Sequence, residues 1–165
     1  IDTSHLYILS VFSFKDSSIK KVIHAIKYFN RKDLVLPLAK ILAKEMITQK
    51  YTGTLVPIPM PRMRKYIRGY NHAEIIAINL SKENNLTLDT GILRRHYSPK
   101  RQVMSKTRSE RLDNQKNTFQ VVKNVQGMSI ILVDDVTTTG ATLKEARRIL
   151  LLHGALEVLA VTIAH

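Results

Sequence analysis

The chain has 165 residues, 44% of them hydrophobic, which suits one compact domain with a full core. It contains no cysteine, which excludes disulfides and thiolate metal sites, and no apolar run reaches the roughly 20 residues that span a membrane, so we expect a soluble protein. Its 26 Lys and Arg against 13 Asp and Glu, with a pI near 10.1, favour either a polyanionic partner or a solvated basic face.

Apolar periodicity predicts strands and helices that alternate along the first half of the chain. Asp16 is expected to cap the first helix, and prolines bound the second strand. The predicted elements are a strand at 10–14, helices at 16–30 and 33–49, a strand at 54–59, a helix at 71–84 and a weak strand at 86–93.

The second half begins with a long polar stretch and ends with clear strand and helix patterns. The expected elements are a polar segment at 94–107, a short helix that opens at Thr107, a buried strand at 129–135, a helix at 141–154 and a strand at 156–165. Strands separated by helices predict an α/β fold with a central, mainly parallel sheet flanked by helices.

Two adjacent carboxylates, Asp134 and Asp135, follow the apolar run 130–133 at the end of a predicted central strand. Open α/β sheets bind ligands beyond the carboxyl ends of their strands. The hydroxyl-rich loop 137–142 then leads into a helix, whose free N–H groups attract a phosphate, while the carboxylates can accept hydrogen bonds from a diol or position Mg²⁺. The pattern predicts a ribose phosphate site. In the alternative interpretation, the two carboxylates only stabilise the start of the following helix, by ~0.3–1 kcal/mol each.

The segment VDDVTTTGAT (133–142) resembles the phosphoribosyl pyrophosphate (PRPP) binding loop of type I phosphoribosyltransferases. The resemblance implies that Asp134 and Asp135 bind the ribose hydroxyls and that Mg²⁺ binds together with PRPP. It assigns the 5′-phosphate to Thr137, Thr138, Thr139, Gly140, Ala141 and Thr142. Many purine-salvage members have an aspartate where this chain has Thr138, so purine salvage is not expected.

A second segment, VPIPMPRMRKYIRGYNHAEIIA (56–77), joins a proline-bounded strand end to a cluster of arginines. Prolines stiffen the turn, and arginines can neutralise a pyrophosphate; the residues predicted to bind it are Pro59, Arg62, Arg64 and Arg68. Gly69 permits a tight turn into the next helix, which begins near Asn71. A basic turn that only solubilises the chain is the alternative. His72 is interpreted as a surface or capping residue rather than a catalytic one.

This segment, with Gln102, Arg111, Asn114 and Phe119, resembles the ComF family of competence proteins, whose members pair V-P-x-P with R-G-[FY]-N-[QH]. Family members generally carry cysteine zinc ligands ahead of the transferase-like domain. This chain has none, so zinc is not expected, and that module was either removed or lost. The chain also opens at Ile1 without methionine, as a trimmed sequence would. We expect residues 1–165 to form a single phosphoribosyltransferase-like domain.

The positive charge is concentrated in residues 62–116, where 13 Lys and Arg against 5 Asp and Glu give +8 of the total +13. Single-stranded DNA is therefore expected to contact Arg62, Arg64, Lys65, Arg68, Arg94, Arg95, Lys100, Arg101, Lys106, Arg108 and Arg111. Tyr66, Tyr70 and Tyr97 lie among these residues and either stack on bases or pack against the protein. The stretch 94–107 suits a lid as well as a nucleic-acid contact.

Two functions remain open from the sequence. The ComF resemblance implies a protein that handles or transports single-stranded DNA into the cytoplasm during natural transformation, with PRPP as a ligand. It would act in the cytoplasm, or be held at the inner membrane by other competence proteins. The alternative is an active phosphoribosyltransferase that transfers the 5-phosphoribosyl group of PRPP to an acceptor. The sequence identifies neither the acceptor nor catalytic residues.

Overall fold

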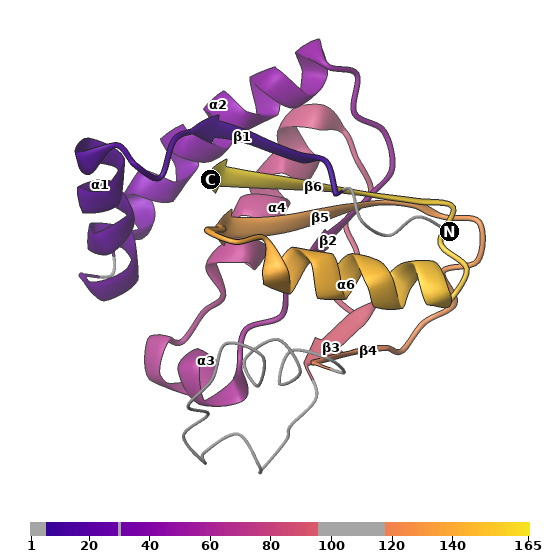
Figure 1. The fold of residues 1–165 in the computed structure, drawn as a ribbon. Coiled ribbons are helices and arrows are strands. Elements are labelled where there is room, and N and C mark those ends of the chain that lie inside the picture. Colours follow the sequence, from indigo (N-terminus) through magenta and orange to yellow (C-terminus); the bar gives the residue numbers. More distant parts are fainter. Residues whose placement is uncertain (1–5, 30, 96–117) are drawn as a thin grey trace.

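The computed structural model of the chain describes residues 6–29, 31–95 and 118–165. Its centre is a four-stranded, fully parallel sheet in the order β1-β6-β5-β2 (Figure 1). The strands are β1 (Ile8–Phe12), β2 (Thr54–Pro57), β5 (Ser129–Val136) and β6 (Glu157–Ala164). The sheet confirms the predicted α/β architecture.

Helices cover both faces of this sheet. One face carries α1 (Ser17–Tyr28), the short 3₁₀ turn η1 (Lys32–Leu34), α2 (Val35–Thr48) and α4 (His72–Asn84); the other carries α6 (Ala141–Leu152). In β5, Ile131 and Val133 belong to the first apolar cluster, whereas Ile130 and Leu132 belong to the second. This alternation follows from the period of two of a strand that is buried on both faces.

Two predictions of local structure were wrong or incomplete. The expected strand at 86–93 is reduced to an isolated bridge between Leu55 and Leu88. The polar stretch 94–107 does not begin as a loop, because β3 (Leu93–Arg95) pairs antiparallel with β4 (Phe119–Val121), which was not predicted. Strands of three residues are too short to show an alternating pattern. The helix expected from Thr107 lies outside the described residues.

A short helix, α3 (Arg62–Arg68), carries the cluster of arginines, where no helix was predicted. None of its residues is buried, so the apolar positions that mark a helix facing a core give no signal there. The other helices agree with the predicted ones to within a few residues, although the first strand begins two residues earlier than expected, at Ile8. Within the described parts of the chain, no helix has both the length and the apolar character needed to cross a bilayer.

Parallel pairing brings the carboxyl ends of the strands to one edge of the sheet. β2 lies beside β5 with Pro57 opposite Val133, and the N–H of Ile58 continues the ladder by donating to the carbonyl of Val133, at 2.9 Å. The backbone that leaves β2 therefore starts next to the carboxylates that end β5. Two segments more than 70 residues apart in the sequence meet here.

Candidate functional site

A cavity of about 470 Å³ opens at this carboxyl edge of the sheet. It contains two carboxylates, from Asp134 and Asp135, and cationic side chains from three separate elements. Its lining is made up of Lys27, Tyr28, Ile58, Pro59, Met60, Pro61, Arg64, Arg68, Asn71, His72, Arg95, Asp134, Asp135, Val136 and Thr142. The cavity therefore offers acceptors for a diol and cations for an anionic group.

The two carboxylates are held by the backbone that follows each of them. Oδ1 of Asp134 accepts the N–H of Asp135 at 2.9 Å, and Oδ1 of Asp135 accepts the N–H of Val136 at 2.8 Å. Burial, and then the neighbouring charge of Asp135, raise the pKa of Asp134 well above its ordinary value. A cation or hydroxyl donor bound there would offset the free-energy cost of holding two neighbouring carboxylates in a buried position.

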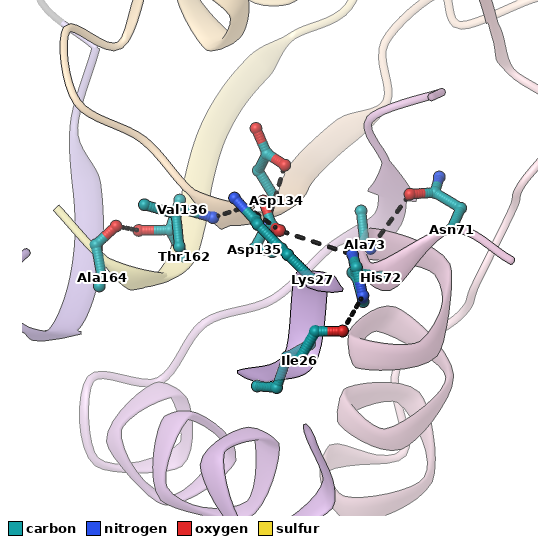
Figure 2. A network of polar contacts seen from close by, with 10 residues as sticks. All are labelled: Ile26, Lys27, Asn71, His72, Ala73, Asp134, Asp135, Val136, Thr162 and Ala164. Carbon is teal, nitrogen blue, oxygen red and sulfur yellow. Dashed lines mark hydrogen bonds and ion pairs between the residues drawn. The ribbon is translucent and has the colours of Figure 1, made fainter. Parts of the chain in front are cut away.

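Lys27 approaches the pair from α1. Its Nζ lies 3.2 Å from Oδ2 of Asp135 (Figure 2). Both side chains are largely covered, with 26% and 19% exposed, so solvent screens this ion pair less than it would a surface pair. Lys27 was not among the predicted site residues, because no sequence signal connects α1 with the end of β5.

His72 lies next to Asp135 and is only 1% exposed, so its interpretation as a surface or capping residue was wrong. Its Nε2 is 3.3 Å from the carbonyl oxygen of Ile26, which can only accept. The neutral ring therefore carries its proton on Nε2 and presents a bare Nδ1, 3.7 Å from Oδ2 of Asp135. Burial lowers the pKa of His72, against the opposing effect of Asp135.

The cap of α4 is instead Asn71, which also fixes the strand end. Its Oδ1 accepts the N–H of Ala73 at 3.2 Å, and its Nδ2 donates to the carbonyl of Ile58 at 2.9 Å. Gly69 ends α3 in the left-handed region at φ +76°, which turns the chain into this cap. The R-G-Y-N-H pattern (68–72) thus contains the last residue of α3, the tight turn at Gly69 and the buried Asn71 side chain, which holds the Ile58 carbonyl just after β2.

The hydroxyl loop after β5 is stabilised internally. Thr137 is buried, and its Oγ1 accepts the N–H of Gly140 at 3.0 Å. Gly140 has φ +69°, and a Cβ there would lie 3.3 Å from Cδ1 of Ile8. Thr138 and Thr139 are exposed, while Thr142 faces the cavity.

This loop leads into an amino terminus that suits an anion. α6 has no acidic residue in its first turn and no side-chain cap on its N-terminal cap residue. The N–H groups of the first turn have no carbonyl partner within the helix, and they lie at the positive end of its dipole. A phosphate bound there would meet backbone donors and the Thr142 hydroxyl.

The predicted pyrophosphate residues are mostly brought together. Pro59, Arg64 and Arg68 line the cavity, whereas Arg62, the first residue of α3, is exposed and is not among the lining residues. Arg95, which was expected to contact DNA, lines the cavity too, and its Nη1 donates to the Pro59 carbonyl at 3.4 Å.

Two of the other residues predicted to contact DNA, Lys65 and Arg94, are described and do not line the cavity. Lys65 pairs with Glu74 at 3.1 Å, and Arg94 is exposed on β3. Tyr66 is 89% exposed, whereas Tyr70 packs edge-on against the His72 ring at 5.0 Å. The remaining predicted residues, Tyr97, Lys100, Arg101, Lys106, Arg108 and Arg111, lie outside the described residues.

The donor set of the cavity fits Mg²⁺ that arrives with a phosphate ligand. Mg²⁺ is commonly bound by one or two carboxylates together with substrate phosphates and water, rather than by a closed protein cage. Asp134 and Asp135 supply two such carboxylates. Across residues 6–29, 31–95 and 118–165, no group of three or more His, Asp and Glu side chains could hold a metal ion by itself.

Comparisons with known proteins agree on the fold. A glutamine PRPP amidotransferase from B. subtilis, solved with ADP and GMP, has a TM-score of 0.51 and 20% sequence identity over 78% of this chain and 25% of its own. At that identity the likeness shows the fold alone.

Sequence comparison identifies nearer relatives. The chain is 30% identical over 143 residues to DNA utilization protein YhgH of Escherichia coli (strain K12), covering 83% of this chain and 63% of that protein. It is 37% identical over 100 residues to Competence protein ComFC of Bacillus subtilis (strain 168), covering 61% of this chain and 39% of that protein. The chain therefore spans less than two thirds of the length of these relatives.

The family model described as "Phosphoribosyl transferase domain" matches residues 35–165, which include the cavity residues on α3, α4, β5 and α6. The match and the named relatives agree with the motifs at the ends of β2 and β5. The chain belongs to the phosphoribosyl transferase domain family, as a ComF-like type I member.

Proposed function

We propose that the cavity binds PRPP with Mg²⁺, and that the protein uses this site while it handles single-stranded DNA during natural transformation. One observation carries the proposal: a single cavity joins the carboxylates of Asp134 and Asp135 to Arg64, Arg68 and the start of α6. A sugar that bears a phosphate at one end and a pyrophosphate at the other matches this order of acceptors and cations.

Each group in the cavity has a role in this proposal. Asp134 and Asp135 accept hydrogen bonds from the ribose hydroxyls, and residues 137–142 with the first turn of α6 hold the 5′-phosphate. Arg64, Arg68 and Lys27 neutralise the pyrophosphate. Mg²⁺, when bound, supplies additional positive charge at the phosphate oxygens.

The DNA part of the proposal is supported by charge and by the relatives' names. The chain has a formal charge of +13, and α3 exposes Arg62 and Arg64 beside the cavity. Its relatives include proteins named for DNA utilization and for competence. We place this role in the cytoplasm, at the inner membrane where other competence proteins bring the strand in, and treat residues 1–165 as one domain.

A second candidate function is transfer of the phosphoribosyl group to an acceptor. Lys27, Arg64, Arg68 and Arg95 all line the cavity, where they would stabilise the charge that develops on departing pyrophosphate. In that reaction the acceptor forms a bond to C1′ of the ribose as the bond from C1′ to the pyrophosphate oxygen breaks. Release of pyrophosphate on addition of an acceptor would distinguish transfer from binding alone.

Calorimetric titration with Mg²⁺ and PRPP tests the site. Asp134→Asn and Asp135→Asn should each weaken binding by about tenfold or more, because each removes a charged acceptor. Glu157→Gln is the matched control, since Glu157 is an exposed carboxylate at the opposite, amino end of β6. Equal affinity in all three variants and the wild type would refute the assignment of the carboxylates.

Anisotropy of a labelled single-stranded oligonucleotide tests the DNA role. Affinity should fall with added salt, by about 0.7 logarithmic units per phosphate contacted for each tenfold rise in salt. Repeating the titration with Mg²⁺ and PRPP present shows whether both ligands use one surface. No binding at low salt would remove the DNA role and leave the PRPP site to be judged by calorimetry.

A further inference from the structure

The outward face of α1 carries an exposed group of aromatic rings. Ile23 and Ile26 turn into the protein and are buried, whereas Tyr28 is 67% exposed and Phe29, the residue after the helix, is 69% exposed. The ring of His24 lies 4.5 Å from that of Tyr28 and 5.7 Å from that of Phe29. We refer to His24, Tyr28 and Phe29 as the α1 aromatic cluster.

Positive charge surrounds this cluster. α1 contains Lys20, Lys21 and Lys27 and no acidic residue, and α3 contains four cations and no acidic residue. The guanidinium of Arg68, on α3, lies 5.9 Å from the Tyr28 ring. Both helices lie on the side toward which the arrows of β5 and β6 point (Figure 1). The rings are therefore flanked by cations at the functional end of the sheet.

Two hollows border the cluster. One, of about 460 Å³, is lined by Lys20, Lys21, His24, Ala25 and Phe29. The other, of about 470 Å³, is lined by Lys27, Tyr28, Arg64, Ile67, Arg68 and Tyr70. The second hollow shares Lys27, Tyr28, Arg64 and Arg68 with the carboxylate cavity. The hollow at Tyr28 therefore adjoins the candidate PRPP site, whereas the hollow at His24 and Phe29 shares no lining residue with either.

We propose that the α1 aromatic cluster is a base-stacking platform for single-stranded DNA, whose strand passes Tyr28 toward the carboxylate cavity. Proteins that bind single strands without sequence preference combine cations along the backbone with rings on which bases stack. The lysines of α1 and the arginines of α3 would contact phosphates on either side of the rings. The inference rests on the proposed DNA role and adds a surface outside residues 62–116.

Single-stranded DNA fits this face better than an anionic membrane does. A helix that lies on a bilayer needs a continuous apolar face to insert. In α1 the aliphatic residues Ile23 and Ile26 are already buried in the protein, and the hollow beside His24 and Phe29 is bordered by Lys20 and Lys21 rather than by aliphatic side chains. Exposed rings bordered by lysines suit single-stranded DNA, whose bases stack on aromatic faces while its phosphates contact cations.

The decisive variant is His24→Ala/Phe29→Ala, because neither residue lines the carboxylate cavity. In anisotropy titrations with labelled oligothymidine, it should bind about tenfold more weakly, with an unchanged salt slope, because stacking rather than charge is lost. Its affinity for Mg²⁺ and PRPP should stay at the wild-type value. Lys20→Ala/Lys21→Ala should instead reduce the salt slope by about 1.4, for two lost phosphate contacts.

Two control variants match these changes elsewhere on the surface. Lys40→Ala/Lys44→Ala removes two exposed lysines from α2, and Tyr7→Ala removes a ring that is 57% exposed on the residue before β1. Both should bind oligothymidine like the wild type. In addition, the chain has no tryptophan, so Tyr28→Trp provides a single reporter whose fluorescence should be quenched when a base stacks on it.

The outcomes separate this inference from the proposed function. Wild-type binding with equal affinity in the α1 variants and no quenching at position 28 would overturn the platform and leave the DNA role intact. No wild-type binding at all would overturn both. If His24→Ala/Phe29→Ala lost binding to phosphatidylserine vesicles but kept its DNA affinity, α1 would be a membrane contact and the platform would be wrong.

Discussion

Nδ1 of His72 lies 3.7 Å from Oδ2 of Asp135, and in the part of the chain that the structure describes it has no hydrogen-bond partner. Protonation of the ring would turn this contact into an ion pair, but burial opposes the charge and lowers the pKa of His72 below its ordinary 6.5. The unfolded chain therefore takes up the proton at a higher pH than the folded protein does.

This relationship predicts the sign of one pH effect. The contribution of His72 to stability is present above pH 6.5 and is lost as the pH falls from there through the lower pKa of the folded state. In an NMR titration, the His72 ring signal, assigned by its loss in His72→Gln, should shift with a midpoint below 6.5. A midpoint above 6.5 would mean that Asp135 outweighs burial.

Asp134→Asn should stabilise the protein without ligand while it weakens PRPP binding. The amide keeps an oxygen to accept the N–H of Asp135, but it removes the charge whose burial, next to Asp135, raises the pKa of Asp134. We expect a gain of the order of 1 kcal/mol in the free energy of unfolding, as for other strained functional sites. Chemical denaturation at neutral pH measures it, and Glu157→Gln should change little.

A lower stability in Asp134→Asn would show that the carboxylate is satisfied in the free protein, for example by Lys27. The Mg²⁺ and PRPP titration of the same samples would then still report on binding separately. The combination expected here, higher stability with lower affinity, is the signature of a residue kept for a ligand rather than for the fold.

Gly140→Ala tests the phosphate loop, with Gly127→Ala as its matched control. Both glycines have a positive φ, +69° and +70°, so each change should cost about 1 kcal/mol of backbone strain. A Cβ at position 127 meets nothing within 4 Å, whereas one at 140 presses on Ile8. Only Gly140→Ala should weaken Mg²⁺ and PRPP binding, measured by calorimetry. Equal losses in both variants would indicate a general effect of stability.

Sequence patterns predicted β2 and β5, whose carboxyl ends form the candidate site, but did not predict all the residues that line it. The buried run that ends at Asp134 was found because β5 is eight residues long and apolar up to the carboxylates. Lys27 comes to Asp135 through the packing of α1, which no spacing reveals. His72 was misread because a helix start is usually exposed, whereas here α1 contacts it through Ile26 and β5 through Asp135. The short helix α3 has no buried residue, so it offered no burial pattern.

Asn71 shows how such a position can be tested for two roles at once. Asn71 is 4% exposed, caps α4 through its oxygen and holds the carbonyl of Ile58 through its nitrogen. Asn71→Ala should cost about 2–4 kcal/mol, since a cap is worth about 1 kcal/mol and a buried carbonyl left unpaired costs about 1–3 kcal/mol. Because Ile58 leads directly to Pro59, binding of Mg²⁺ and PRPP should weaken as well.

Asn71→Ser separates the two contributions. A serine caps a helix about as well as asparagine does, so about 1 kcal/mol of stability should return, but its shorter side chain does not reach the Ile58 carbonyl. Affinity for Mg²⁺ and PRPP should therefore stay low in Asn71→Ser even though part of the stability is recovered. If affinity recovered together with stability, the helix cap alone would position the site, and the hydrogen bond from residue 71 to the Ile58 carbonyl would not be needed for binding.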